Sequence, residues 1–323
     1  MIALYTLLSL PLSNTVVATP SKEVEFRNFQ HISVNQDGNS LLVTECVKMR
    51  AQNCFSFAYD IQKNEGKLIP SSEPALDAIS AEYDGQAIVV SEYSAQNNQS
   101  KIGQITDGAY AHLFVTSGLV KSPRRRNDDS FIYWKGVESN GWVRYDLMKK
   151  PFGSSSENFL VGPHGFYSYG TYVTLRDGRV LMSGDGPFSI KDIFTYKRRF
   201  NGSETYSTKE GEGHLPRPMF TDIEYAKLPR LTMAENVFIV GQDNSGMHIY
   251  KYSIEGRQID KHKIPAEVGV INYMSEPTKT NSIYVIAQPR DGGREKYVIA
   301  RLNLKNSTWS LLAIPRIAAT IGK

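Results

Sequence analysis

The chain has 323 residues, of which 41% are apolar and 22% charged, so a folded globular protein is expected rather than a disordered one. At this length about three-quarters of the unfolded chain's surface can be buried, so neither a metal nor a dense disulfide framework is needed for stability. The net charge of +4 is too small and too scattered to predict a nucleic-acid partner. The 18 Tyr and 14 Phe, together with many β-branched residues, favour strands over helices.

Residues 1–18 differ from everything that follows. They carry no charge, include the apolar run Ile2–Leu10, and end in small residues suited to signal-peptidase cleavage after Ala18. We therefore predict a signal peptide over 1–18, a single domain over 19–323, and a periplasmic or secreted protein. No Lys or Arg precedes the apolar run, so a buried strand is the alternative. No other stretch approaches membrane-spanning length, so the mature protein is expected to have no membrane span.

The two cysteines stand at the facing ends of two apolar stretches. Cys46 ends the strand predicted over 41–45, and Cys54 begins the strand predicted over 55–59. If these strands form a hairpin, the thiols face each other, and an oxidising compartment would close a disulfide that contributes about 2–3 kcal/mol through loop entropy. Two buried thiols are the alternative. A structural zinc is not expected, because no second Cys or His pair stands at ligand spacing.

One phrase recurs along the chain: an apolar strand, a polar turn that often contains Asp-Gly, and a strand rich in β-branched residues. Three copies carry the Asp-Gly turn, at Asp37-Gly38, Asp84-Gly85 and Asp177-Gly178, and three looser copies begin at Lys121, Leu231 and Tyr273. The copies are about 45–50 residues apart, and nearly 60 between the fourth and the fifth, which is the length of one four-stranded propeller blade. After each phrase a third strand, a tight turn and an outer strand are expected.

The strand, the Asp-Gly turn and the Leu/Ile-led apolar run that follows it resemble the repeat of TolB-like β-propellers, in which the Asp-Gly turn joins the two inner strands of a blade. The likeness covers residues from about 25 to 315. It departs from the usual repeat because Pro is absent before the Asp-Gly and three copies are degraded. The expected fold is all-β, a propeller of six four-stranded blades, with an uncertainty of one blade. The resemblance implies a scaffold that binds another envelope protein or peptide.

The ring of blades is expected to close through its termini, because an open ring exposes sheet edges. The alternating segment Glu23–Phe29 is predicted to supply a strand to the C-terminal blade. The C-terminal segment Trp309–Ile314 is predicted to lie beside it or to form the neighbouring strand.

Candidate binding residues are sought on the loops of one face and at the mouth of the central channel, because the blades themselves are packing. The glycine-rich loop 161–170 offers a binding surface or, alternatively, aromatic residues folded back on the blade; its candidates are His164, Phe166, Tyr167 and Tyr169. A long insertion is predicted over 196–229, which is either a surface excursion or a partner-binding edge; its candidates are His214 and Arg217.

A run of three arginines occupies the position of the Asp-Gly turn in the third copy. Arg126 and its two predecessors could bind phosphate, sulfate or an acidic sugar. A solvated turn flanked by Asp128 and Asp129 is the alternative.

Catalytic motifs are missing from the sequence. There is no nucleophile elbow, phosphate-binding loop or dinucleotide fingerprint, and a metal site at His31, His112 and His164 would have to be assembled in space. No catalytic residue, metal or cofactor is therefore predicted. We expect a monomeric, non-enzymatic scaffold whose partner is an envelope or extracellular protein, or a carbohydrate. The alternative is a propeller-type polysaccharide lyase or glycoside hydrolase with its site at the channel mouth.

Overall fold

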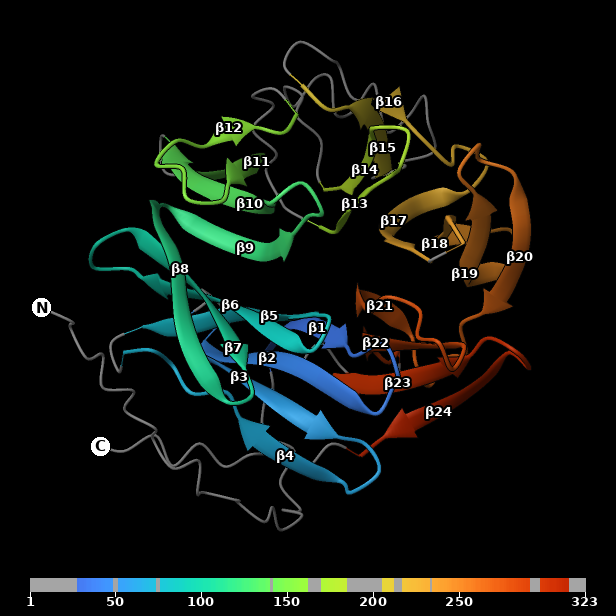
Figure 1. Ribbon diagram of the computed structural model, residues 1–323. Helices are drawn as coiled ribbons and strands as arrows, with labels where there is room; N and C mark the ends of the chain where they lie inside the picture. The colour runs from blue at the N-terminus through green and yellow to red at the C-terminus, as the bar shows by residue number, and fades with distance from the viewer. Residues whose placement is uncertain are drawn as a thin grey trace, which may run out of the picture.

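The computed structural model describes residues 28–48, 52–73, 76–139, 142–161, 170–184, 205–211, 217–232, 234–290 and 297–313. These residues form six sheets of four antiparallel strands, arranged in a ring around a central axis (Figure 1). The prediction of a six-bladed all-β propeller is confirmed. The described residues include no helix long and apolar enough to cross a membrane.

Each blade is made of four consecutive strands. The first two blades contain β1 Asn28–Val34, β2 Ser40–Lys48, β3 Gln52–Asp60, β4 Glu65–Leu68, β5 Asp77–Asp84, β6 Ala87–Ser94, β7 Gln99–Thr106 and β8 Ala109–Ser117. The third and fourth contain β9 Leu119–Arg125, β10 Ser130–Ser139, β11 Trp142–Pro151, β12 Asn158–Phe159, β13 Tyr172–Thr174, β14 Arg179–Ser183, β15 Thr205–Lys209 and β16 Arg217–Pro218. The last two contain β17 Glu224–Leu231, β18 Asn236–Asp243, β19 Gly246–Ser253, β20 Gln258–Lys263, β21 Val270–Met274, β22 Ser282–Gln288, β23 Val298–Asn303 and β24 Thr308–Leu312.

The first strand of each blade lies nearest the axis, and these inner strands are β1, β5, β9, β13, β17 and β21 (Figure 1). Every inner strand runs in the same direction, so the ring has two distinct ends. We call the end where the inner strands begin the entrance face, and the end that carries the turns between first and second strands the turn face.

The turn between the first and second strands contains a left-handed residue in every blade, although its sequence varies. The six residues with positive φ are Gly38 (73°), Gly85 (62°), Asp129 (53°), Gly178 (80°), Glu235 (55°) and Asn281 (56°). A residue with positive φ at this point gives the turn a twist that matches the right-handed twist of the two strands it joins. The degraded copies of the repeat have therefore lost the glycine while keeping the turn.

The blades are held together by a separate hydrophobic cluster at each of the six interfaces between neighbours. Because side chains alternate along a strand, one strand can serve two interfaces. In β10, Phe131 and Tyr133 pack towards the second blade, whereas Ile132 and Trp134 pack towards the fourth. All four are at most 1% exposed. Burying an apolar side chain of this size stabilises the fold by about 1.5–3 kcal/mol.

Among the described residues the ring closes by packing, and the prediction of a shared closing strand is wrong for residues 28–29, the part of the segment 23–29 that they include. Phe29 lies in β1, which pairs with β2 inside the first blade, and the last blade consists of β21–β24. The first and last blades instead meet in a hydrophobic cluster that contains Ile32 and Ile286. At the turn face the Tyr284 hydroxyl donates to the Gly38 carbonyl at 2.8 Å. Residues 23–27 lie outside the described part of the chain.

The long insertion predicted between the fourth and fifth copies is also corrected. Residues 196–229 include β15 and β16, the two outer strands of the fourth blade, and most of β17, the inner strand of the fifth. The fifth copy of the repeat therefore begins at Glu224 rather than Leu231.

The predicted disulfide is present. Cys46 and Cys54 are direct partners on β2 and β3, and their sulfur atoms are bonded.

Candidate functional site

Charged side chains from opposite sides of the ring meet at its axis. Arg124 of β9, in the third blade, donates through Nε to Glu82 Oε2 of β5 at 2.5 Å. Its Nη1 reaches Glu276 Oε1, which follows β21 in the sixth blade, on the far side of the axis. Arg230 of β17 lies with Nη1 3.8 Å from the same Glu276 oxygen and donates through Nε to the Met274 carbonyl at 2.5 Å. We call Glu82, Arg124, Arg230 and Glu276 the axial ion cluster.

The other two blades complete the surroundings of this cluster. His31 of β1 has Nε2 3.4 Å from Glu82 Oε1, and neither atom has a hydrogen-bond partner in the described part of the chain. Tyr172 of β13 holds its ring 5.5 Å from the Arg124 guanidinium carbon. Its hydroxyl donates to the carbonyls of Ser122 and Ile132, both at 2.8 Å. All six blades thus contribute a side chain to the axis.

Burial and mutual repulsion set the charges of the basic groups at the axis. Burial, followed by the repulsion of Arg230, Arg124 and Lys121, holds the pKa of His31 well below its usual value, so the imidazole is neutral at pH 7. Burial lowers the pKa of Lys121 to about 8. Burial and then the nearby Arg124 lower the pKa of Arg230 to about 10. Among the described residues at the axis, two carboxylates, Glu82 and Glu276, face the three cations Lys121, Arg124 and Arg230.

A cavity of about 280 Å³ opens above this cluster at the mouth of the channel. Its lining residues come from five blades: Phe29, Gln30, His31, Ser122, Gly170, Thr171, Leu228, Arg230, Asn272, Tyr273 and Tyr297. Phe29 and Gln30 lie at the start of β1, and Gly170 and Thr171 lie just before β13, which places this side of the cavity towards the entrance face. Phe29 packs edge-on against Tyr297, with ring centroids 6.2 Å apart. The mouth therefore combines aromatic walls, amide groups and a cationic floor.

The residues that the sequence analysis selected for binding fall largely elsewhere. His164, Phe166, Tyr167, Tyr169 and His214 lie outside the described residues. Arg217 is exposed on β16, the outer strand of the fourth blade.

The three consecutive arginines have three different environments. Arg126 forms ion pairs with Asp128, at 3.7 Å, and with Glu210 of the neighbouring blade. Arg125 pairs with Asp129 at 3.1 Å and remains 44% exposed. Arg124 points to the axis. The interpretation of all three as one solvated turn is therefore wrong for Arg124, which belongs to β9.

The histidines do not gather at the axis as a metal site would require. His31 lies on an inner strand, but His112 is exposed on β8, the outermost strand of the second blade. No group of His, Cys, Asp and Glu side chains in the described ranges is arranged to hold a metal ion.

The axial ion cluster was missed by sequence reasoning, although the repeats contain a signal for it. Each of its four members stands two residues before the residue that opens the turn of its blade: Asp84, Arg126, Thr232 or Thr278. Aligning the copies on their turns, instead of on their apolar runs, places these charges at one equivalent position. A charge at an inner-strand position in several blades predicts an ion cluster on the axis, because that is where inner strands meet.

Comparison with known proteins gives the fold and no family. No protein-family model matches the chain, and no curated protein matches its sequence. TolB from Acinetobacter baumannii is similar in structure, with a TM-score of 0.54 and 10% identity over 88% of this chain and 62% of TolB. The GH74 enzyme of Niastella koreensis has a TM-score of 0.54 and 12% identity over 88% of this chain and 45% of the enzyme.

A third similar structure is a puromycin-hydrolysing peptidase of Mycobacterium tuberculosis, with a TM-score of 0.52 and 10% identity over 90% of this chain. The chain spans 55% of that peptidase. At these identities the likeness establishes the β-propeller architecture, which this chain shares with TolB, a GH74 enzyme and a peptidase.

Proposed function

We propose that the chain is an exported binding propeller that holds a protein partner at the channel mouth. The observation that carries the proposal is the state of the axial carboxylates. Glu82 is 4% exposed on its side chain and is bound by Arg124, and Glu276 is bound by both arginines. Carboxylates engaged in this way stabilise the axis and are poorly placed to transfer protons to a substrate.

The chemistry of the mouth suggests what the partner presents. The cavity of about 280 Å³ accommodates one or two side chains, not a folded domain. Its floor carries the guanidinium of Arg230, and its walls include Tyr273, Tyr297 and Asn272. Aromatic and amide side chains suit a polypeptide segment, because they offer contact area and hydrogen bonds together. A segment with an acidic side chain or a free C-terminus fits this environment best.

Export agrees with the disulfide between Cys46 and Cys54, since disulfides persist in oxidising compartments. A periplasmic or secreted location and the signal peptide over 1–18 remain part of the proposal. The resemblance of the repeats to TolB-like propellers supports an envelope partner.

The test is affinity capture from an envelope extract with three baits: the wild-type chain, Tyr273→Ala with Tyr297→Ala, and Lys305→Ala as a control on the turn face. We expect one stoichiometric partner that the wild type and Lys305→Ala retain and the double variant loses. Capture that is unaffected by the double variant would contradict binding at the mouth. Cleavage of a polysaccharide panel by the wild type, abolished in Glu82→Gln, would instead establish the lyase or hydrolase alternative.

A further inference from the structure

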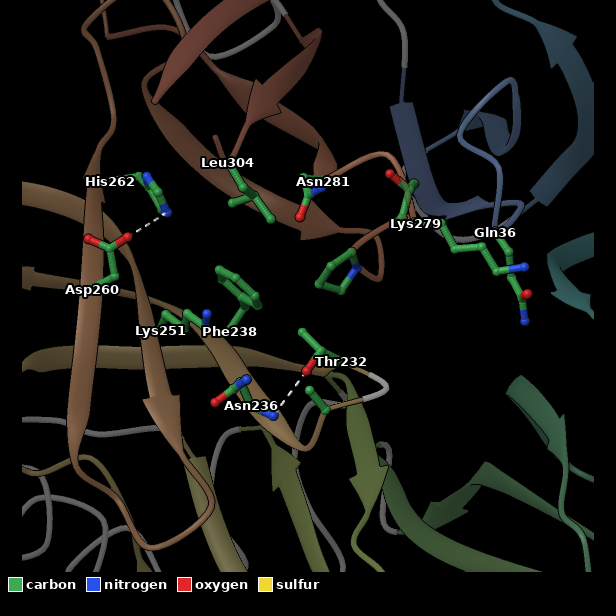
Figure 2. A pocket seen from close by; sticks show the side chains of 13 residues that line it. Gln36, Thr232, Asn236, Phe238, Lys251, Asp260, His262, Lys279, Asn281 and Leu304 are labelled. Carbon is green, nitrogen blue, oxygen red and sulfur yellow. Dashed lines mark hydrogen bonds and ion pairs between the residues drawn. The ribbon is translucent and has the colours of Figure 1, made fainter. Parts of the chain in front are cut away.

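A second cavity, of about 380 Å³, lies on the turn face between the fifth and sixth blades. It shares no lining residue with the channel mouth. Its walls come from the turns after β1, β17, β21 and β23 and from β18, β19 and β20. Figure 2 shows Phe238 at its centre, Lys251 and Asn236 on one side, and Leu304 and Asn281 on the other. The cavity has the size of a small-molecule site.

Some polar side chains of this cavity are held by neighbouring side chains, whereas others have no hydrogen-bond partner among the described residues. The His262 ring is held by Ser307 Oγ, 2.8 Å from Nδ1, and has Asp260 Oδ2 3.7 Å from Nε2. Burial lowers the pKa of His262 although Asp260 opposes it, so the ring is neutral at pH 7. In contrast, the side-chain amides of Gln36, Asn236 and Asn281 have no hydrogen-bond partner among the described residues.

The charge of the cavity is positive. Lys251 and Lys279 contribute two ammonium groups, and neither has an ion-pair partner in the part of the chain that the structure describes. Asp260 contributes one carboxylate, so the net charge at neutral pH is +1. A monoanion neutralises this charge, whereas a phosphate dianion would meet the Asp260 carboxylate and leave the amide carbonyls without donors.

We propose that this cavity binds a sugar acid of one or two residues. The hydroxyl groups of a sugar both donate and accept hydrogen bonds, and so do the side-chain amides of Gln36, Asn236 and Asn281. Each amide can therefore donate to one sugar hydroxyl and accept from another. The carboxylate of a uronic acid would pair with Lys251, and the carbon face of the ring would lie on the apolar floor of Phe238, Pro277 and Leu304. The inference goes beyond the proposed function, because the two sites lie on opposite faces.

The test is isothermal titration of the disulfide-bonded chain with galacturonate, a monoanion, and with its uncharged methyl ester. We expect saturable binding of the acid and at least about a tenfold weaker affinity for the ester, since the ester cannot form a charge-assisted hydrogen bond with Lys251. The ester comparison uses the unmodified chain, so it does not depend on the folding of any variant.

Matched variants locate the site. Lys251→Gln is expected to weaken galacturonate binding about tenfold or more while leaving the affinity for the ester nearly unchanged. Asn236→Ala with Asn281→Ala is expected to weaken binding of both ligands. Lys305→Gln, an exposed lysine next to the cavity rim but outside its lining, serves as the control and should change neither.

Three results would overturn the inference: no saturable binding at millimolar galacturonate, equal binding of acid and ester, or binding that is unchanged in Lys251→Gln. Competition by inorganic phosphate at the same concentration as galacturonate would show a simple anion site instead. Loss of binding in Tyr273→Ala with Tyr297→Ala would place the ligand at the channel mouth. None of these results bears on partner capture at the mouth, so the two proposals fail separately.

Discussion

His31 is the residue through which the axis responds to acid. Its imidazole is buried among Glu82, Glu276 and three cations, and burial with the repulsion of the cations keeps its pKa well below 6.5. As the pH falls below 6.5, His31 becomes protonated in the unfolded chain but stays neutral in the folded chain. Acid therefore favours the unfolded state, and the stability that is lost in acid is fully present above about pH 6.5.

We expect the free energy of unfolding to fall by up to about 1.4 kcal/mol per pH unit below 6.5 from His31. Urea denaturation between pH 7.5 and 5 measures this slope. His31→Asn should make the slope shallower, and His112→Asn, an exposed control on β8, should leave it unchanged. His262 also has a lowered pKa, so part of the slope remains in His31→Asn. Equal slopes in the wild type and His31→Asn would contradict the assignment.

Glu235 occupies the left-handed position of its turn without the freedom of glycine. Its φ is 55°, and in the described part of the chain it forms an ion pair with Arg176, at 3.4 Å, whose side chain is 82% exposed. Relief of the left-handed strain outweighs the greater flexibility of unfolded glycine and the loss of a weak surface pair. Glu235→Gly is expected to raise stability by about 0.5–1 kcal/mol in thermal unfolding.

A matched control is Glu255→Gly, which changes an exposed turn residue whose φ is not left-handed. That substitution should lower stability, because glycine adds unfolded-state entropy there and the hydrogen bond between the Glu255 carboxylate and Ser253 is lost. A loss of stability in both variants would show that the turn of the fifth blade tolerates Glu235 without strain.

At the scale of the element, the first blade carries a covalent constraint between its second and third strands. The disulfide of Cys46 and Cys54 is buried with Ile79 of the next blade. Replacing both cysteines by alanine is expected to cost about 2–3 kcal/mol, because the closed loop of eight residues no longer restricts the unfolded chain. Urea denaturation of the double variant and of the oxidised wild type measures the difference. Equal stability would mean that unfolded-state entropy contributes little in this blade.

The elements differ in how well the sequence predicts them, and the fifth blade shows why. Its inner strand β17 contains two register shifts and Pro229, and Tyr225 and Leu228 adopt positive φ. These features destroy the alternation of apolar and polar residues that identifies a strand. The strand was therefore assigned to an insertion, and Arg230 was overlooked with it. The regular strands of the first and second blades keep their alternation and their Asp-Gly turns, and they were predicted correctly.

At the scale of the whole molecule, the number of blades could be predicted because every repeat carries its own turn and apolar strand. The mode of closure could not. An alternating segment such as 23–29 predicts a strand but does not specify the sheet it joins, because backbone pairing leaves no trace in side-chain type. The axial ion cluster differs from the closure, since its charges occupy one equivalent position of the repeat, but which of them pair is decided only once the ring has formed.

Closure by packing makes the interface between the first and last blades equivalent to the other five. Ile286 of β22 is fully buried there with Phe29 and Ile32, as Ile239 is at the interface of the fourth and fifth blades. Ile286→Ala and Ile239→Ala are each expected to cost about 2–5 kcal/mol in chemical denaturation. Hydrogen exchange should show that the loss in Ile286→Ala extends to β1 and β2, because those strands lose their partner across the closing interface. A cost near zero for Ile286→Ala, beside a normal cost for Ile239→Ala, would mean that the ring is open in solution.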